Sequence, residues 1–365
     1  MNLVSILEKA TASPHDLNDS ELGFLLRLNS KGELDALQKA AYTVKERHIG
    51  RRVSMRGVIE FGNYCSKNCY YCGIRSGNSG VKRYQIARDD ILRMAKWAFE
   101  QKYGSIVLQS GEIKSQENTD FVLDVLQGIK EFSGGELGIT LCLGEQEPEV
   151  YEAWRSAGAH RYLLRIETTN RELYGKIHPP DHDFDVRMAC LRSLKKLDYQ
   201  VGTGIMSGLP GQTVEDLVQD LRFFVEFDID MLGMGPYLPH EATPLGQGRK
   251  LDNEFRQRQL LLGLKMIACA RLLLHDVNIA ATTALQALND TGREKGLRFG
   301  ANVLMPNVTD TLYRGDYLLY EGKPCLDENS AQCRECLSHR VHSTGETIRW
   351  GEWGDSPHFL RVKNG

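Results

Sequence analysis

Residues 53–73 read VSMRGVIEFGNYCSKNCYYCG, an apolar strand pattern that runs directly into three closely spaced cysteines. The stretch from Val53 to Phe61 predicts a buried β-strand, because β-branched and aromatic side chains suit a pleated surface. Cys65, Cys69 and Cys72 follow in a C-x3-C-x2-C spacing. Three thiolates on one loop can converge on a metal centre, and sulfur is a soft ligand typical of iron–sulfur clusters. The stretch therefore predicts a metal-binding loop after the first strand of a sheet.

The number of thiols matters as much as their spacing. A 4Fe–4S cube has four irons, so three protein ligands leave one iron open to an outside ligand. Two alternatives are a structural zinc site and three buried cysteines without metal. Zinc sites usually pair C-x2–4-C units or combine cysteine with histidine, and no histidine lies near this loop in the sequence. The spacing favours iron–sulfur.

Short apolar segments alternating with longer amphipathic ones continue to about residue 306. Seven further strands are predicted at Ser105–Gln109, Leu137–Leu143, Arg161–Ile166, Gln200–Met206, Met231–Met234, Asn278–Thr282 and Ala301–Pro306. Helices are predicted at Asp89–Gln101, Thr119–Phe132, Glu147–Ala157, Asp185–Leu197, Thr213–Phe227 and Asn253–Leu274. This alternation predicts a parallel sheet, and eight such units fit a complete (βα)8 TIM barrel with its active site at the carboxyl ends of the strands. The alternative is an open doubly wound sheet, but no Gly-rich dinucleotide fingerprint opens the first helix.

The regions flanking the barrel pattern have a different character. Residues 1–50 predict a helical segment, because leucines such as Leu22, Leu25 and Leu26 recur at helical spacing. We therefore expect three parts: the N-terminal helical segment 1–50, a barrel over residues 51–310, and a C-terminal segment over 311–365 that contains a second cysteine cluster.

Composition excludes several classes of protein. The 365 residues include 45 Lys and Arg against 48 Asp and Glu, a net charge of −3, so no overall field favours nucleic acid or an anionic membrane. The longest apolar stretch, Leu260 to Leu274, is interrupted by Lys265 and Arg271, which argues against a membrane span. The start, MNLVSILEKA, has no basic region followed by a long apolar run, so we expect a cytoplasmic protein. Its nine cysteines suit metal binding better than a disulfide framework, although Cys190 and Cys269 fall in helical patterns and are expected in the core.

The cysteine loop, with Tyr71 directly before its last cysteine, resembles the radical S-adenosylmethionine superfamily. From about Val53 to Cys336 the chain resembles the HydE family of FeFe-hydrogenase maturases, in the segments IEFGNYCSKNCYYCGIR, KRY, IVLQSGE, RYLLRIET, GIMSGLPGQT, DMLGMGPYLPHEATPL, IAATTA, GANVLMPN and YRGDYLLYEGKPC. Biotin synthase and methylornithine synthase share the barrel and parts of these motifs. The LPGQT, PHEATPL and ATTA segments favour HydE over both.

The resemblance implies that Cys65, Cys69 and Cys72 hold a catalytic 4Fe–4S cluster whose open iron chelates S-adenosylmethionine. Glu112 would receive the amino group of that cofactor, and Arg187 would pair with its carboxylate. The resemblance also implies that Glu167 lies near the ribose and methionine part, that Met234 packs on the adenine, and that the Tyr71 backbone lies at its edge. The other residues expected at the cofactor are Gln109, Ser110 and Cys142. The plainer alternatives are a helix-start acid for Glu112 and a surface side chain for Arg187.

Two arginines on predicted core strands suggest a chamber inside the barrel. Arg56 and Arg165 match HydE cavity positions, and two buried guanidinium groups would attract a small anion. The alternative is an ion pair of either arginine with Glu60 or Glu167, since buried charges are normally paired. The remaining residues expected to line the substrate chamber are Thr140, Thr282, Thr283, Tyr317 and Tyr320.

Two positions depart from the HydE pattern. Ile166 stands where the family often has histidine, and Cys142 replaces a serine. Either change can alter the surroundings of the cofactor, which leaves room for a shifted substrate.

A second cysteine group lies near the C-terminus. Cys325, Cys333 and Cys336 form C-x7-C-x2-C, a spacing that in some HydE members holds an auxiliary cluster, of 2Fe–2S or 4Fe–4S type. A zinc site completed by His339 or His342, or no metal at all, are the alternatives.

Taken together, the resemblance implies a radical S-adenosylmethionine enzyme that takes part in assembly of the di-iron subcluster of FeFe-hydrogenase. Its implied substrate is small, anionic and sulfur-containing: a cysteine-ligated iron carbonyl cyanide complex from the maturase HydG. Transient contacts with HydG and HydF, and an electron donor such as flavodoxin or ferredoxin, belong to the same expectation. The alternative is a HydE-like enzyme acting on an amino acid or sulfur compound, of methylornithine synthase or biotin synthase type.

Overall fold

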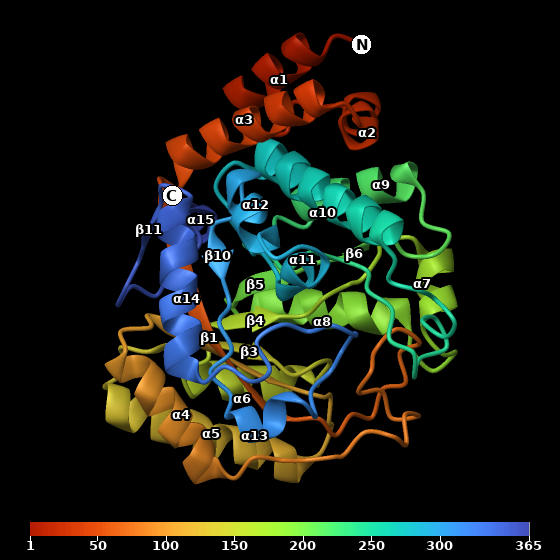
Figure 1. Ribbon diagram of the computed structural model, residues 1–365. Helices are drawn as coiled ribbons and strands as arrows, with labels where there is room; N and C mark the ends of the chain where they lie inside the picture. The colour runs from red at the N-terminus through yellow and green to blue at the C-terminus, as the bar shows by residue number, and fades with distance from the viewer. Residues whose placement is uncertain (365) are drawn as a thin grey trace.

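Eight parallel strands form the centre of the protein, whose computed structural model describes residues 1–364 (Figure 1). The strands run in the order β10-β1-β2-β3-β4-β5-β7-β9. The sheet closes between β9 and β10, where Ala280 and Val303 form a parallel bridge and the Asn302 N–H donates to the Ile279 carbonyl at 2.9 Å. The bounds are β1 Arg52–Gly62, β2 Ser105–Ser110, β3 Gly138–Cys142, β4 Arg161–Leu163, β5 Gln200–Thr203, β7 Met231–Leu232, β9 Asn278–Ile279 and β10 Val303–Leu304. The predicted complete (βα)8 barrel is confirmed.

Several strands are shorter than the sequence pattern predicts. The predicted strand Gln200–Met206 divides into β5 and β6 (Met206–Ser207), and a matching short strand, β8 (Gly235–Pro236), follows β7. Strands β6 and β8 pair with each other as a separate two-stranded sheet beyond the barrel. The backbones come very close at this step, because a Cβ on Gly204 would lie 2.4 Å from the Gly233 carbonyl oxygen. Only glycine allows that approach.

Helices surround the barrel at the six predicted amphipathic segments. The barrel helices are α4 Arg88–Glu100, α5 Gln116–Ser133, α6 Pro148–Ser156, α7 Arg171–Ile177, α8 Phe184–Lys196, α9 Val214–Glu226, α10 Asn253–Leu274, α11 Thr283–Leu288 and α12 Gly292–Arg298. Three of these, the shorter helices α7, α11 and α12, were not predicted. Local capping explains a typical start: the Thr213 hydroxyl accepts from the Asp216 N–H, and the Asp216 carboxylate accepts from the Thr213 N–H. No helix among residues 1–364 has the length and apolar character needed to cross a lipid bilayer.

The N-terminal segment is helical, as predicted, and lies outside α10 (Figure 1). Its helices are α1 Leu3–Ala12, α2 Asp19–Arg27 and α3 Lys31–His48. Helix α10 is buried along most of its length because the barrel covers one side and α2 and α3 cover the other.

The C-terminal elements are α13 Thr311–Arg314, α14 Ser330–Ser343, β11 Thr347–Ile348 and α15 Pro357–Asn364. The part after α14 closes the amino-terminal end of the barrel, where β11 pairs with the start of β1. The Gly354 carbonyl accepts from Arg56 Nη2 at 3.0 Å and from Asn278 Nδ2 at 2.9 Å, while Asp355 pairs with Arg161 at 2.5 Å. The opposite end, where the strands terminate, carries the cysteine loop.

Candidate active site at the carboxyl ends of the strands

The loop after β1 carries the three cysteines, and the end of β2 holds its first half in place. The Glu112 N–H donates to Cys65 Sγ at 3.3 Å, and the Ser66 N–H donates to the Glu112 carbonyl at 2.8 Å. Between them Gly111 is required, since a Cβ there would lie 2.1 Å from the Tyr64 carbonyl oxygen. The predicted strand-end motif QSGE thus positions the cysteine loop.

The segment between α7 and α8 holds the second half of the loop. The Tyr70 N–H donates to the Ile177 carbonyl at 3.0 Å, and the Asn68 N–H donates to His182 Nε2 at 3.2 Å. The Tyr71 hydroxyl lies 3.3 Å from Nε2 of His178. Two buried histidines, which the sequence analysis did not single out, therefore brace the loop between its first and last cysteines.

The environment of the three thiols suits a multi-iron centre. Burial raises the pKa of Cys65, Cys69 and Cys72, that of Cys69 to about 12. Bound cations would oppose this effect and favour the thiolates. The sulfur atoms of Cys65, Cys69 and Cys72 are not all within 4.8 Å of one another; among residues 1–364 such a group of three ligand atoms lies elsewhere. A cube places each thiolate on its own iron, so the wider arrangement agrees with a cluster better than with a single ion.

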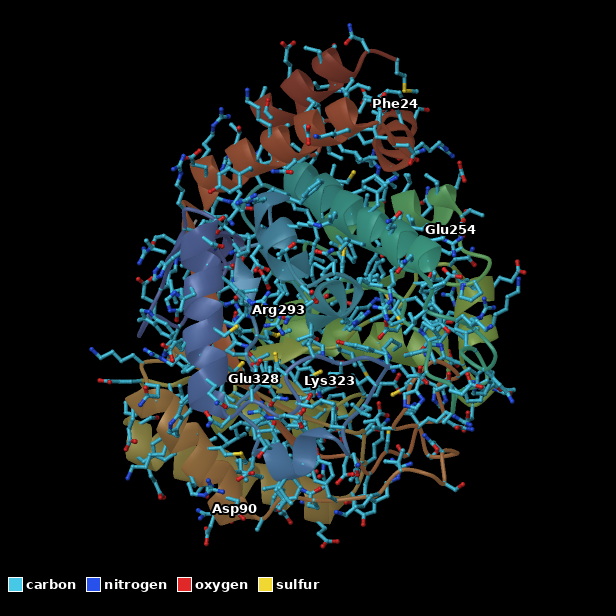
Figure 2. The ribbon with its side chains drawn as sticks, viewed as in Figure 1. Phe24, Asp90, Glu254, Arg293, Lys323 and Glu328 are labelled. Carbon is cyan, nitrogen blue, oxygen red and sulfur yellow. The ribbon has the colours of Figure 1, made fainter. Side chains whose placement is uncertain are left out.

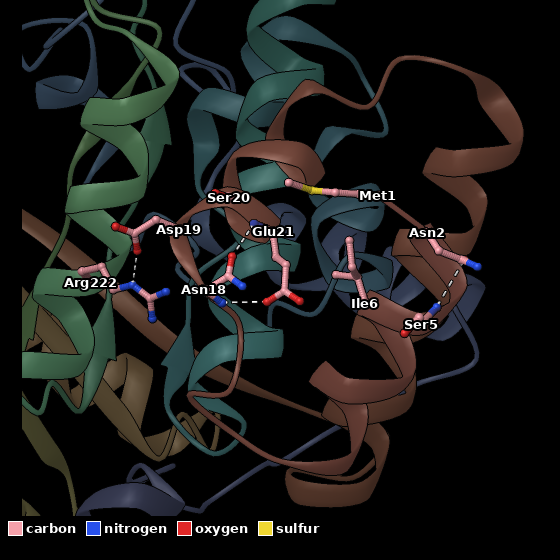
Figure 3. A pocket seen from close by; sticks show the side chains of 9 residues that line it. All are labelled: Met1, Asn2, Ser5, Ile6, Asn18, Asp19, Ser20, Glu21 and Arg222. Atoms are coloured by element: carbon pink, nitrogen blue, oxygen red, sulfur yellow. Dashed lines mark hydrogen bonds and ion pairs between the residues drawn. The ribbon is translucent and has the colours of Figure 1, made fainter.

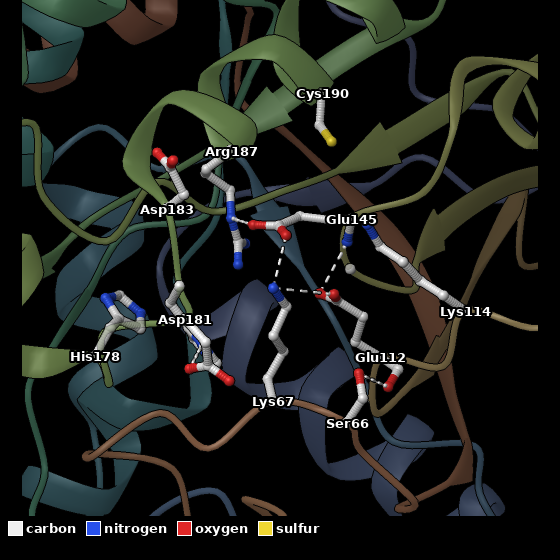
Figure 4. Close-up of polar contacts among 12 residues, drawn as sticks. Ser66, Lys67, Glu112, Lys114, Glu145, His178, Asp181, Asp183, Arg187 and Cys190 are labelled. Carbon is white, nitrogen blue, oxygen red and sulfur yellow. Dashed lines mark hydrogen bonds and ion pairs between the residues drawn. The ribbon is translucent and has the colours of Figure 1, made fainter.

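A chain of buried charges lies beside the loop (Figure 4). Glu145 accepts from Lys67 Nζ at 2.8 Å and from Arg187 Nε at 2.7 Å. The Arg187 side chain also donates to the Arg165 carbonyl at 3.1 Å, and it is buried. Arg187 is therefore not a surface side chain, and its guanidinium lies among the residues that hold the mouth of the barrel.

Glu112 presents an oxygen that no protein group satisfies. Its Oε2 accepts from the Glu145 N–H at 2.9 Å, whereas its buried Oε1 accepts no hydrogen bond and lies 3.5 Å from Lys67 Nζ. Gly144 leaves the room this carboxylate needs, since a Cβ there would lie 2.2 Å from Oε2. Burial raises the pKa of Glu112 despite the nearby charges of Arg187 and Lys67. An ammonium group would satisfy the free oxygen, so the residue fits the amino group of S-adenosylmethionine.

Arg165 and Glu167 lie at the end of β4 and face each other. Arg165 Nη2 is 2.9 Å from Glu167 Oε2 without forming an aligned hydrogen bond, and Arg165 Nε also lacks a partner. Glu167 has a φ of +66°, in the left-handed region that side chains rarely adopt. Burial raises the pKa of this carboxyl although Arg165 opposes the effect. Arg165 is therefore paired with Glu167, the alternative considered from the sequence, while Arg165 Nε and Glu167 Oε2 still lack hydrogen-bond partners.

Arg56 lies elsewhere in the barrel. It lines an internal cavity of about 30 Å³ together with Thr140, and Arg165 is not among the residues lining that cavity. Burial, reinforced by the charge of Arg161, lowers the pKa of Arg56, whose Nε has no hydrogen-bond partner. Its other nitrogens donate to the Gly354 carbonyl and to Met231 Sδ. Glu60 pairs instead with Lys323, at 2.6 Å.

The other predicted residues lie on the strand ends and on the loop after α13. The Gln109 amide donates to the Tyr317 hydroxyl at 3.2 Å, and the hydroxyls of Thr283 and Tyr320 lie 2.7 Å apart. The Ser110 hydroxyl donates to the Gly111 carbonyl and is thereby used locally. The hydroxyls of Thr140 and Thr282 are buried and have no hydrogen-bond partner within residues 1–364. The Cys142 thiol is half-buried, and Met234 is buried.

The C-terminal cysteines do not all converge. The ligand atoms of Cys325, Cys333 and Glu328 lie within 4.8 Å of one another, and Cys336 is not part of this group. Cys336 Sγ instead accepts from Arg340 Nε at 3.3 Å. The two histidines considered as zinc ligands line a separate surface hollow together with Arg334 and Glu335.

A larger hollow, of about 750 Å³, is lined by none of the predicted site residues (Figure 3). It is an open depression between α1, α2 and α9, with Asp19 paired to Arg222 and Glu21 closing the capping box of α2. Several of its lining residues are already used in helix capping or in surface ion pairs. Size alone therefore does not identify the functional site here.

Comparison with known proteins supports the interpretation of the loop. Residues 59–224 match the family profile described as the Radical SAM superfamily. The FeFe-hydrogenase maturase subunit HydE of Thermotoga maritima is 44% identical over 320 residues, which cover 88% of this chain and 88% of the relative. This chain belongs to the HydE family. It is a radical S-adenosylmethionine enzyme, and family membership implies a 4Fe–4S cluster and S-adenosylmethionine as cofactors.

More distant similarities agree with the fold of this HydE-family chain. The 3-methylornithine synthase of Methanosarcina acetivorans is 30% identical over 79% of this chain and 79% of the relative. A crystal structure of methylornithine synthase superposes with a TM-score of 0.80 at 27% identity, covering 95% of this chain and 98% of the other. The maturase HydG from Carboxydothermus hydrogenoformans, at 19% identity and a TM-score of 0.77 over 95% of this chain and 79% of its own, shares the fold.

Four residues that the sequence did not predict hold the predicted site residues and the cysteine loop of this HydE-family site in place. Glu145 and Lys67 form ion pairs in the network with Arg187 and Glu112, while His178 and His182 contact the cysteine loop. Lys67 stands inside the cysteine motif and Glu145 follows a predicted strand, so position offered a signal for these two. The histidines gave none, since their partners are more than a hundred residues away in sequence.

Proposed function

We propose that this protein is a HydE-type maturase that takes part in assembly of the di-iron subcluster of FeFe-hydrogenase. The observation that carries the proposal is the 44% identity over 88% of the chain to the HydE subunit. Methylornithine synthases, at about 30% identity, and biotin synthases, at about 26%, are more distant.

Cys65, Cys69 and Cys72 would hold the cluster, and Glu112, Glu167 and Arg187 would orient S-adenosylmethionine beside it. Unsatisfied oxygens on both acids and the buried guanidinium of Arg187 match the ammonium and carboxylate of that cofactor. When bound, the reduced cluster and S-adenosylmethionine supply a 5′-deoxyadenosyl radical, whose target we infer to be a small anionic sulfur compound such as a cysteine-ligated iron carbonyl cyanide complex.

The protein's own contribution is to bind, orient and enclose. Free nitrogens on Arg165 and Arg56 are available to an anionic substrate or to ordered water, and the loop bearing Tyr317 and Tyr320 covers the barrel interior. HydG as the source of the substrate, HydF as a further contact, and a flavodoxin or ferredoxin as electron donor complete the proposal.

The cluster assignment is tested by replacing one ligand. The full chain, reconstituted anaerobically with iron and sulfide and reduced, is expected to convert S-adenosylmethionine to 5′-deoxyadenosine, detected by mass spectrometry. The Cys69→Ala variant should lose this cleavage because one iron loses its only protein ligand. Cys269→Ala, a buried thiol in α10, is the matched control and should retain it. Persistent cleavage by verified Cys69→Ala protein would contradict the assignment.

The biological role needs a different assay. In a mixture of the other two maturases with apo-hydrogenase, the wild-type chain should support hydrogen evolution, and Cys69→Ala should not. The strongest alternative is an amino-acid mutase, favoured by the TM-score of 0.80 to methylornithine synthase. An isomerised amino acid formed during S-adenosylmethionine cleavage, with no gain in hydrogenase activity, would decide for that alternative.

A further inference from the structure

Tyr174, on α7, is a buried tyrosine whose hydroxyl is unused. The side chain is 2% exposed, and its hydroxyl has no hydrogen-bond partner among residues 1–364. A hydroxyl that leaves water without gaining a partner destabilises the folded chain, and buried polar groups in native proteins are normally paired. The unused hydroxyl therefore indicates either an ordered water or a ligand at this position.

The surrounding contacts fix the ring of Tyr174. Its centroid lies 4.1 Å from that of the His178 ring and 5.3 Å from that of Phe184, which meets it edge-on. His178 Nδ1 also donates to the Tyr174 carbonyl at 2.9 Å. The first turn of α7 is capped by Asn170, whose side chain accepts from the Leu173 N–H at 3.0 Å. The ring, and with it the position of the hydroxyl, is thus held without any ligand.

The cysteine loop lies between α7 and the loop that carries Lys323 (Figure 2). On the Lys323 side, the Gly73 N–H donates to the Leu319 carbonyl at 2.9 Å. On the other side, the Tyr70 N–H donates to the carbonyl of the last residue of α7 at 3.0 Å. Tyr174 stands three residues before that contact, so it belongs to the wall of the site that faces the cysteines.

The charge of Arg187 acts on the Tyr174 phenol. Burial raises the pKa of Tyr174 to about 12, and Arg187 is the strongest influence in the opposite direction. Burial likewise opposes the charge of Arg187, but Glu145 and then Tyr174 raise its pKa. Because such influences weaken with distance, the phenol lies near this guanidinium, although no hydrogen bond joins the two. The phenol keeps its proton at neutral pH and is available as a donor.

Arg187 has a nitrogen to spare beside this phenol. Its Nε donates to Glu145 at 2.7 Å and its Nη1 to the Arg165 carbonyl at 3.1 Å, whereas Nη2 makes no hydrogen bond within residues 1–364 (Figure 4). The proposed partner of Arg187 is the carboxylate of S-adenosylmethionine. A carboxylate has two oxygens with about four acceptor positions, so one guanidinium nitrogen satisfies only part of it. The Tyr174 hydroxyl is a second free donor near the same guanidinium.

We propose that the Tyr174 hydroxyl donates a hydrogen bond to the carboxylate of S-adenosylmethionine and completes the contact that Arg187 begins. Tyr174 lies outside the segments that carry the resemblance to HydE. The inference rests on the proposed function, from which it takes the place of the carboxylate at Arg187. Hydrogen bonds to a charged acceptor are about twice as strong as neutral ones, so this bond would offset the desolvation of the hydroxyl.

The affinity of the full chain for S-adenosylmethionine tests the proposal. Tyr174→Phe removes the hydroxyl and keeps the ring. Wild type and variant are reconstituted anaerobically to equal iron content, and equilibrium dialysis against labelled S-adenosylmethionine gives the Kd. We expect the Kd of Tyr174→Phe to rise about tenfold, as loss of one hydrogen bond to a charged group does. Decarboxylated S-adenosylmethionine, measured as a competitor, lacks the acceptor and should bind both proteins equally.

Thermal unfolding without S-adenosylmethionine separates a ligand contact from a structural one. Tyr174→Phe should unfold at the wild-type temperature or slightly above it, because the lost hydroxyl had no partner. Tyr199→Phe is the matched control: Tyr199 is also 2% exposed, but its hydroxyl donates to the Tyr151 carbonyl at 2.7 Å. That variant should unfold at a lower temperature and bind S-adenosylmethionine as the wild type does.

The results that would overturn the proposal differ from one another. An unchanged Kd in Tyr174→Phe, with normal binding by the wild type, would assign the hydroxyl to water and leave the proposed function intact. Equal weakening for S-adenosylmethionine and its decarboxylated form would place the hydroxyl at another part of the cofactor. A fall in unfolding temperature equal to that of Tyr199→Phe would make the hydroxyl structural. Failure of the wild type to bind S-adenosylmethionine would overturn this inference and the proposed function together.

Discussion

At the residue scale, the mouth of the barrel depends on buried charges that share partners. Glu145 is 2% exposed and contacts both Lys67 and Arg187. Burial opposes its ionisation, but Arg187 and Lys67 outweigh that cost and lower the pKa of Glu145. Removing one partner of such a network leaves a buried charge poorly compensated, which costs more than the pair contributes.

Arg187→Gln is therefore expected to destabilise the protein by about 3–5 kcal/mol, the typical cost of breaking a buried ion pair. The free energy of unfolding is measured by urea titration. Arg171→Gln is the matched control, because Arg171 pairs with Asp185 on the surface, where such pairs contribute about 1 kcal/mol or less. If both variants lose the same amount, Glu145 does not depend on Arg187.

At the element scale, α15 is held to the amino-terminal end of the barrel by one histidine between two acids. His358 Nδ1 lies 3.0 Å from Asp230 and Nε2 lies 2.9 Å from Asp228. Both ring nitrogens must donate to satisfy both acceptors, so the imidazole is protonated. Burial disfavours that charge, yet Asp230 and Asp228 outweigh it and raise the pKa of His358.

This geometry gives the attachment of α15 a pH dependence. Because the pKa is raised on folding, the stabilisation is complete below the ordinary value of about 6.5 and is lost as the pH rises through the folded-state pKa. His358→Ala should thus lower the unfolding temperature most near pH 6, roughly, and least near about pH 9. Lys363 lies on the same helix and forms an exposed ion pair with Asp198, so Lys363→Gln should change little at either pH. A deficit in His358→Ala that does not vary with pH would contradict the mechanism.

At the scale of the whole molecule, the chain closes its own barrel. The residues after β11 reach the start of β4, where Asp355 binds Arg161 and lies 3.4 Å from His160. Burial works against the charge of Asp355, but the neighbouring His160 and the charge of Arg161 hold its pKa well below the ordinary value. The polar amino-terminal end of the barrel therefore depends on residues about two hundred positions later in sequence.

Asp355→Asn should destabilise the protein by about 3–5 kcal/mol, because Arg161 is fully buried and loses its counter-charge. The depressed pKa stabilises the wild type above about pH 3.9, and this contribution is lost as the pH falls through the folded-state value. The difference between wild type and variant, followed by urea unfolding, should accordingly shrink on acidification. Glu352→Gln, which removes a surface pair with Arg52, serves as the control. An equal loss in the two variants would refute the closing role of Asp355.

Local patterns in the sequence determined the barrel, the cysteine loop and the family. The strand of Val53 to Phe61, the C-x3-C-x2-C spacing and the QSGE strand end each involve neighbouring residues, so their chemistry can be read in order along the chain. The boundaries of β5 and β6 could not be predicted from the sequence, because the strand breaks at Gly204, where Gly233, between β7 and β8, approaches closely.

The choice of partner among several buried or half-buried side chains was decided by the tertiary structure. Glu60 pairs with Lys323 and not with an arginine, and Arg165 pairs with Glu167. Cys336 contacts Arg340, whereas Glu328 lies beside Cys325 and Cys333. Spacing shows which side chains can bind a metal or an ion, but not which way each one points. A buried charge or thiol takes whichever partner the packing brings within a few ångströms, and that choice exists only once the barrel has closed.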